Sequence, residues 1–107
     1  MIKISETAEA FKALPLGNIC DANGKGGNMD SGIKPIDPAC NMAGPAYTVK
    51  GHPRDNVAIH KAIYEAPEGS VLVVDTSGYC NSGHFGEIMA TACKMRGILG
   101  LVIDGGV

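Results

Sequence analysis

A glycine-rich segment at residues 76–87, with the sequence TSGYCNSGHFGE, holds the residue types that could bind a small ligand. It follows an apolar run that ends at Asp75 and precedes a helical pattern that starts near Gly86. Open α/β sheets bind ligands beyond the carboxyl ends of their strands, and the first N–H groups of a helix have no partner within that helix. We therefore expect the backbone N–H groups of residues 86–89 to hold a carboxylate or a phosphate.

Four ionisable side chains near this segment each have a functional and a structural interpretation. Glu87 could be a metal-linked carboxylate, but the helix dipole also favours an acidic residue in a first helical turn. The residue type alone favours this structural interpretation. His84 could be a ligand or an acid/base, but a single loop histidine is more often solvated. Asp75 and Asp104 each end an apolar run, where both functional and turn-forming carboxylates occur.

Other chemistries lack the required spacing. The glycines at 78, 83 and 86 do not form GxGxxG, and no GK[ST] sequence follows them, which argues against dinucleotide and P-loop sites. The cysteines match no CxxC pattern, so zinc and thioredoxin-like chemistry are excluded, and we expect free thiols that act as small core residues. They are Cys20, Cys40, Cys80 and Cys93. His52 and His60 have no companion at ligand spacing, and we expect structural roles for both.

Length and composition indicate one ordinary folded domain over residues 1–107. Hydrophobic residues make up 45% and charged residues 19% of the 107, as in globular proteins. The net charge of −2 gives no basic surface for a nucleic acid partner. No stretch approaches the roughly 20 apolar residues of a membrane span, and the start lacks the features of a signal peptide. We expect a cytoplasmic protein that binds neither nucleic acid nor membrane.

Hydrophobic periodicity predicts an α/β fold that positions the glycine-rich segment. We expect a helix capped by Ser5 and ending near Leu14, and a helix capped by Asp55 and ending near Glu65. A short helix is expected over 16–22, a loop over 24–32, strands over 46–50, 71–74 and 101–103, and a helix over 86–96 with Gly97 following it. The last two strands and the helix between them form one clear βαβ unit.

The spaced set of short motifs VLVVD, GE, ATA, RG and VIDG between residues 71 and 105 resembles the 4-hydroxy-4-methyl-2-oxoglutarate aldolase/RraA-like family. The segments LGNICDAN at 16–23 and AGPAYTVK at 43–50 also look like N-terminal segments of that family. The resemblance covers most of the chain. Taken in this order and spacing, the motifs are specific for the family rather than for one function within it.

The resemblance implies a swivelling β/β/α fold and a homotrimer, or a hexamer built from two trimers, with a site at the subunit boundary. Aldolase members of the family are lyases that cleave 4-hydroxy-4-methyl-2-oxoglutarate to two pyruvates, and many also decarboxylate oxaloacetate, with a divalent cation such as magnesium or manganese. Carried onto this sequence, the substrate carboxylate lies on the backbone of Gly86, Glu87, Ile88 and Met89. Glu87 is then the catalytic residue that contacts the metal through water.

The family's VIDGGV segment is normally followed by an arginine, which grips the 2-oxo acid, and an aspartate, which binds the metal directly. This sequence stops at Val107. We therefore expect that the chain is a truncated domain and that 1–107 alone is inactive. The resemblance also leaves an alternative function open, because some RraA-like relatives are regulators that inhibit a ribonuclease by binding to it.

Overall fold

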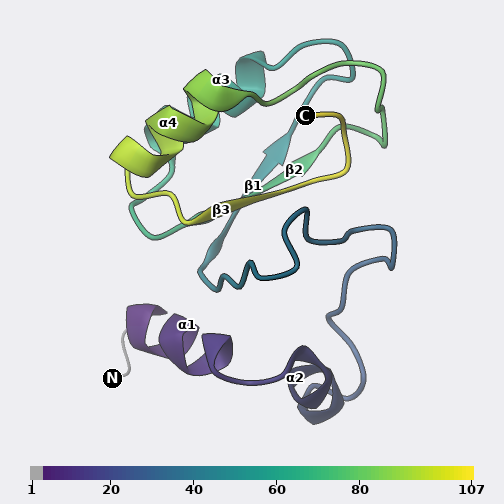
Figure 1. Ribbon diagram of the computed structural model, residues 1–107, viewed down its shortest axis with the longest axis vertical. Coiled ribbons are helices and arrows are strands. Elements are labelled where there is room, and N and C mark those ends of the chain that lie inside the picture. Colours follow the sequence, from purple (N-terminus) through teal and green to yellow (C-terminus); the bar gives the residue numbers. More distant parts are fainter. Residues whose placement is uncertain (1–3) are drawn as a thin grey trace. The chain divides into compact units, whose positions relative to one another are not determined.

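The computed structural model describes residues 4–107, with the backbone alone of Ser5. The chain divides into two compact units, one up to Ala43 and the other from Gly44 to Val107 (Figure 1). No helix in the described part of the chain is long and apolar enough to cross a membrane.

The first unit contains two helices followed by irregular backbone. Helix α1 spans Ile4–Lys12 and helix α2 spans Leu16–Ala22. The expected Ser5 cap is wrong because α1 already begins at Ile4, and α1 ends before the predicted Leu14. The boundaries of α2 and the loop over 24–32 are confirmed. The side chain of Asn41 donates a hydrogen bond to the Lys12 carbonyl oxygen at 2.9 Å, which ties the end of this unit to the end of α1.

The second unit is a parallel three-stranded sheet with two helices. Its elements in chain order are β1 (Ala46–Lys50), α3 (Val57–Glu65), β2 (Val71–Asp75), α4 (Glu87–Met95) and β3 (Gly100–Ile103). The sheet has the order β1-β2-β3, so β2 is central. Lys50 pairs with Asp75 and Val74 with Ile103, which places the carboxyl ends of all three strands at one edge. The α/β class and the βαβ unit formed by β2, α4 and β3 are confirmed.

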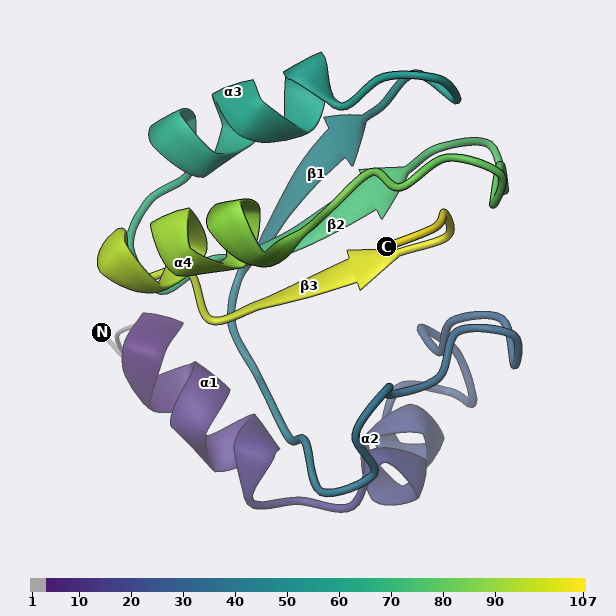
Figure 2. The ribbon, with the colours of Figure 1, turned by 45° about the horizontal axis from the view of Figure 1, so that its top comes forward.

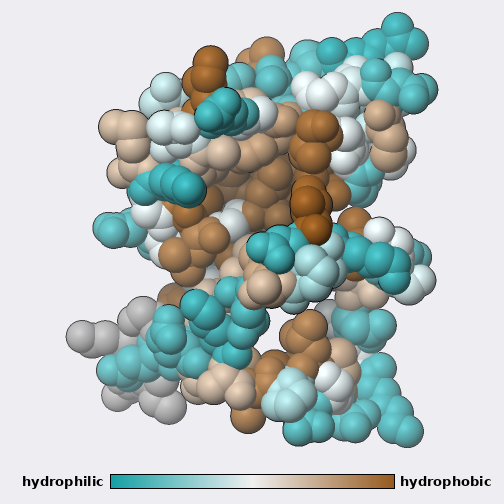
Figure 3. Space-filling view, viewed as in Figure 1, coloured by the Kyte–Doolittle hydropathy of each residue, from teal (hydrophilic) through white to brown (hydrophobic). Residues whose placement is uncertain are grey.

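Both helices pack on the same face of the sheet (Figure 2). The centre of the core consists of Ile59 and Ile63 from α3 and Leu72 from β2, which are at most 1% exposed. Strand β3 is only partly buried along its whole length. Figure 3 shows hydrophobic side chains gathered on this unit between the helices and β3. The apolar positions that predicted α3 and β2 therefore form the buried core of this unit.

The ends of α3 and α4 differ slightly from the expected ones. Helix α3 begins at Val57 with Asn56 as its cap residue, but Asp55 still accepts a hydrogen bond from the Val57 N–H at 3.2 Å. Helix α4 is one residue shorter at each end than the predicted 86–96. Gly97 follows it with a φ of +73°, a left-handed conformation that favours glycine, as predicted.

Candidate functional site

A pocket of about 540 Å³ lies at the N-terminal end of α4. Its lining comes from the backbone that leads into the helix, from the first turn of α4 and from the start of α3. The lining residues are Asn56, His60, Gly83, Phe85, Gly86, Glu87, Ile88 and Met89. All four residues at which the sequence predicted anion binding therefore line one pocket, and they lie beyond the carboxyl end of β2 as expected.

The first turn of α4 presents free backbone donors to this pocket. The Gly86 carbonyl accepts the first helical hydrogen bond, from the Ala90 N–H at 2.9 Å, and no side chain caps the helix. Within residues 4–107, no hydrogen bond is made by the N–H groups of residues 86–89. Four N–H groups at the positive end of a helix form a suitable environment for a carboxylate or phosphate.

Asn56 and His60 form the wall that faces α4, and the sequence analysis missed both. The Asn56 amide donates a hydrogen bond to the Met89 Sδ at 3.6 Å, which links the start of α3 to the first turn of α4. His60 is exposed and lines the same pocket, and its expected structural role stays a prediction. The separation of four residues, which places both side chains on one face of a helix, is the signal that could have found them.

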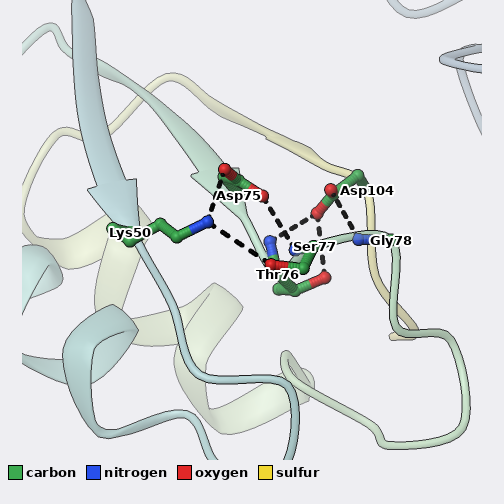
Figure 4. Close-up of polar contacts among 6 residues, drawn as sticks. All are labelled: Lys50, Asp75, Thr76, Ser77, Gly78 and Asp104. Atoms are coloured by element: carbon green, nitrogen blue, oxygen red, sulfur yellow. Dashed lines mark hydrogen bonds and ion pairs between the residues drawn. The ribbon is translucent and has the colours of Figure 1, made fainter.

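Asp104 joins the end of β3 to the loop after β2 (Figure 4). Its Oδ1 accepts hydrogen bonds from the Thr76 N–H at 2.6 Å and the Thr76 hydroxyl at 2.8 Å, and its Oδ2 accepts one from the Gly78 N–H at 2.9 Å. Partial burial on its own raises the pKa of Asp104, but these hydrogen bonds outweigh it and the pKa lies below its ordinary value. The carboxylate is therefore an organiser of the loop and does not line the pocket.

Asp75 has a similar structural role at the end of β2. Its carboxylate pairs with the Lys50 Nζ at 2.9 Å and accepts a hydrogen bond from the Ser77 N–H at 2.8 Å. The hydrogen bond from Lys50, and then that from Ser77, lowers the pKa of Asp75. Both strand-end carboxylates thus fit the turn-forming interpretation.

His84 is buried, with 1% of its surface exposed, so the expectation of a solvated histidine is wrong. Its Nε2 lies 2.9 Å from the Pro53 carbonyl oxygen and 3.2 Å from that of His52. Its neighbours Gly83 and Phe85 line the pocket, but His84 itself does not. The ring therefore supports the pocket wall from behind.

All four cysteines are free thiols, as expected. Cys93 is buried in α4, and burial raises the pKa of its thiol. Cys40 and Cys80 are exposed, so the prediction that the cysteines are core residues is wrong for these two.

The residues present do not form a complete cation site. Within residues 4–107 no three His, Cys, Asp or Glu side chains gather in a way that could hold a metal ion. Glu87 is the one carboxylate among the residues that line the pocket. A hard divalent cation takes about six or more oxygen ligands, including waters, and one carboxylate supplies only a small part of them.

Sequence comparison gives a clear family for this chain. A sequence model of the RraA-like family described as Aldolase/RraA matches residues 16–107. A protein of Halalkalibacterium halodurans named "Putative 4-hydroxy-4-methyl-2-oxoglutarate aldolase" is 38% identical over 97 residues, which are 91% of this chain and 46% of that protein. The chain thus spans about half the length of this curated relative.

Solved structures share the fold. An uncharacterized protein from Pseudomonas syringae matches with a TM-score of 0.82 and 29% identity over 98% of this chain and 49% of the other. The RNA-processing inhibitor RraA from Thermus thermophilus matches with a TM-score of 0.73 and 22% identity over 86% of this chain and 56% of the other, a likeness of fold alone. The extent of the family match and the similarity to the Halalkalibacterium protein show that the chain belongs to the Aldolase/RraA family.

Proposed function

We propose that the complete protein is a carbon–carbon lyase that cleaves 4-hydroxy-4-methyl-2-oxoglutarate to pyruvate and also decarboxylates oxaloacetate. The observation that carries this proposal is the pocket at the N-terminus of α4, where residues 86–89 present unpaired N–H groups. Both substrates carry a carboxylate next to a keto group. The membership of the Aldolase/RraA family and the name of the Halalkalibacterium relative support the same reaction class.

In this proposal the backbone of Gly86, Glu87, Ile88 and Met89 holds the carboxylate of the 2-oxo acid. Hydrogen bonds from N–H groups to a carboxylate are charge-assisted and fix its orientation. Asn56 and His60, which line the same pocket, contact the remainder of the ligand in this proposal. Phe85, Ile88 and Met89 contribute apolar side chains to the lining of the same pocket. A fixed carboxylate places the keto carbon and the bond to be broken at a constant position.

A divalent cation, magnesium or manganese, is the cofactor of the proposed reaction and supplies charge stabilisation at the keto oxygen when bound. Glu87 is the residue of this chain that would contact it, through water. We propose that the direct ligands lie outside the described residues, which hold no cluster of three ligand side chains. We further propose a cytoplasmic homotrimer or hexamer, in which neighbouring subunits complete the site.

The test uses the full-length protein and a coupled assay for pyruvate. We expect pyruvate release from 4-hydroxy-4-methyl-2-oxoglutarate that depends on added magnesium or manganese and disappears with a chelator. Oxaloacetate decarboxylation is measured in parallel against the same metal concentration without protein. Pyruvate formation no faster than this free-ion rate with either substrate would reject the lyase and leave the ribonuclease regulator as the function to examine.

A further inference from the structure

His84 connects, through its buried ring and its backbone N–H, three loops at the end of the sheet where the strands stop. Its Nε2 contacts the carbonyl oxygens of His52 and Pro53, in the loop after β1. His84 itself belongs to the loop after β2, and its backbone N–H donates a hydrogen bond to the Gly106 carbonyl oxygen, after β3, at 2.8 Å. One residue therefore ties together the loops that follow β1, β2 and β3.

The partners of the ring determine which nitrogen donates. Both neighbours of Nε2 are carbonyl oxygens, which only accept hydrogen bonds, so Nε2 carries a proton and donates. Nδ1 is buried and makes no hydrogen bond within the described residues. The backbone at Gly105 passes close to it, since a Cβ there would lie 3.0 Å from Nδ1. The structural contribution of the side chain therefore comes from its Nε2–H group.

The backbone that His84 anchors is one wall of the candidate site. Gly83, Phe85 and Gly86 flank it and all line the pocket. Gly83 pairs with Gly106 in an isolated parallel β-bridge, but a Cβ added at Gly83 or Gly86 would meet no atom within 4 Å, so no side-chain packing holds these two glycines. Glycine has the largest conformational freedom of any residue. Besides this bridge, the wall is anchored by Phe85, which packs against the core, and by the polar contacts of His84.

We propose that His84 is a positioning residue of the candidate site. By donating its Nε2–H group to the loop after β1, it fixes the backbone of residues 83–86 and hence the direction of the N–H groups that begin α4. This inference rests on the proposed function, because those N–H groups are the proposed carboxylate donors. His84 does not itself line the pocket, so its effect on a ligand passes through the backbone.

The test compares His84→Gln with His84→Asn in the full-length protein. The amide nitrogen of Gln can occupy the place of Nε2, whereas that of Asn is closer to the place of Nδ1, so only Gln retains the donor. We measure KM and kcat for 4-hydroxy-4-methyl-2-oxoglutarate and the Kd of pyruvate. Loss of one charge-assisted contact should raise the KM and Kd of His84→Asn about tenfold, while His84→Gln stays within about threefold of the wild type.

The division between KM and kcat separates positioning from a purely structural role. A variant that only folds less completely has fewer active molecules, which lowers kcat at constant KM, whereas a misdirected N–H group raises KM. If His84→Asn does not fold, His84→Met fills the space without a donor, and the same rise in KM is expected. Unchanged KM and Kd in a folded Asn or Met variant would overturn the inference. A wild-type protein that neither binds pyruvate nor cleaves the substrate would instead reject the proposed function.

Discussion

The carboxylate of Asp104 accepts hydrogen bonds from both the backbone N–H and the hydroxyl of Thr76, through the same oxygen. Thr76 is fully buried and directly follows β2, and Asp104 directly follows β3. Asp104 therefore joins the ends of two neighbouring parallel strands through a side chain, at the edge where the backbone ladder of the sheet stops. The glycine-rich loop that leads to the candidate site starts from this junction.

We expect Asp104→Asn to lower the free energy of unfolding by about 1–2 kcal/mol at neutral pH, because the amide group would turn one donor toward the donors of Thr76 or Gly78. The pKa of Asp104 is lower in the folded protein than in the unfolded chain. The ionised carboxylate therefore contributes to stability at a pH above its unfolded-state pKa, and this contribution is lost as the pH falls through its folded-state pKa. Urea denaturation should therefore show a smaller difference between wild type and variant at about pH 3 than at about pH 6. Asp75→Asn is the matched control, and its loss should be clearly smaller because its ion pair with Lys50 is exposed and screened by solvent. Equal losses in both variants would contradict the junction role of Asp104.

We expect Gly105→Ala to destabilise the protein by about 1–3 kcal/mol, the usual cost of overfilling a packed region. A Cβ at this position would lie 2.6 Å from the Thr76 Oγ1 and 3.0 Å from the His84 Nδ1. Thr76 cannot move without weakening its bonds to Asp104. The measurement is thermal unfolding, with Gly83→Ala as the control because a Cβ there meets no atom within 4 Å. Equal melting temperatures for the two variants would show that the Asp104–Gly106 turn adapts freely.

Local patterns predicted the elements but not the polar contacts between loops. The strand Ala46–Lys50 follows from its β-branched and aromatic content, the helix end at Glu65 from the turn residues after it, and the βαβ unit from apolar runs and glycine placement, all of which act over a few residues. The partners of His84 lie more than 30 residues away in sequence, in a turn whose carbonyl groups carry no residue-type signal. The burial of His84 therefore could not be predicted.

In the candidate site, too, the sequence predicted the local features but not those that depend on tertiary contacts. The free N–H groups at the start of α4 are a property of any helix N-terminus, so the sequence was sufficient to predict them. The contribution of Asn56 and His60 to the pocket depends on α3 lying beside α4, which is a tertiary relationship. His60 became recognisable as a candidate only once the structure had placed the two helices together.

We expect Glu87→Ala in the full-length protein to lower pyruvate formation at least about tenfold, the usual scale for a carboxylate that orients metal-bound water. Glu87 is exposed and its side chain makes no hydrogen bond or ion pair within the described residues, so thermal unfolding should change little. Lys94→Ala, an exposed position in the last turn of the same helix, is the control and should retain activity. Unchanged activity of Glu87→Ala at saturating magnesium would leave Glu87 as a residue favoured only by the helix dipole.

The last prediction concerns residues 1–107 alone, which we expect to be inactive toward oxaloacetate and 4-hydroxy-4-methyl-2-oxoglutarate even with magnesium or manganese added. Cleavage leaves negative charge on the departing enolate, and in the proposed reaction a bound cation would stabilise that charge. The described residues keep the N–H groups of α4 but have no cluster of three side chains that could hold that cation.

In the family, VIDGGV is followed by an arginine and an aspartate. The proposed arginine would make a bidentate contact with the 2-oxo acid, and the proposed aspartate would bind the metal directly. A backbone N–H group can replace neither of them. Weak binding of pyruvate by the 107 residues is therefore compatible with the proposal, whereas turnover is not. The assay follows oxaloacetate decarboxylation against the same metal without protein, and the full-length protein is the positive control. Metal-dependent turnover by residues 1–107 above the free-ion rate would overturn the proposed arrangement and direct attention to Asp75, His84 and Asp104 as ligands.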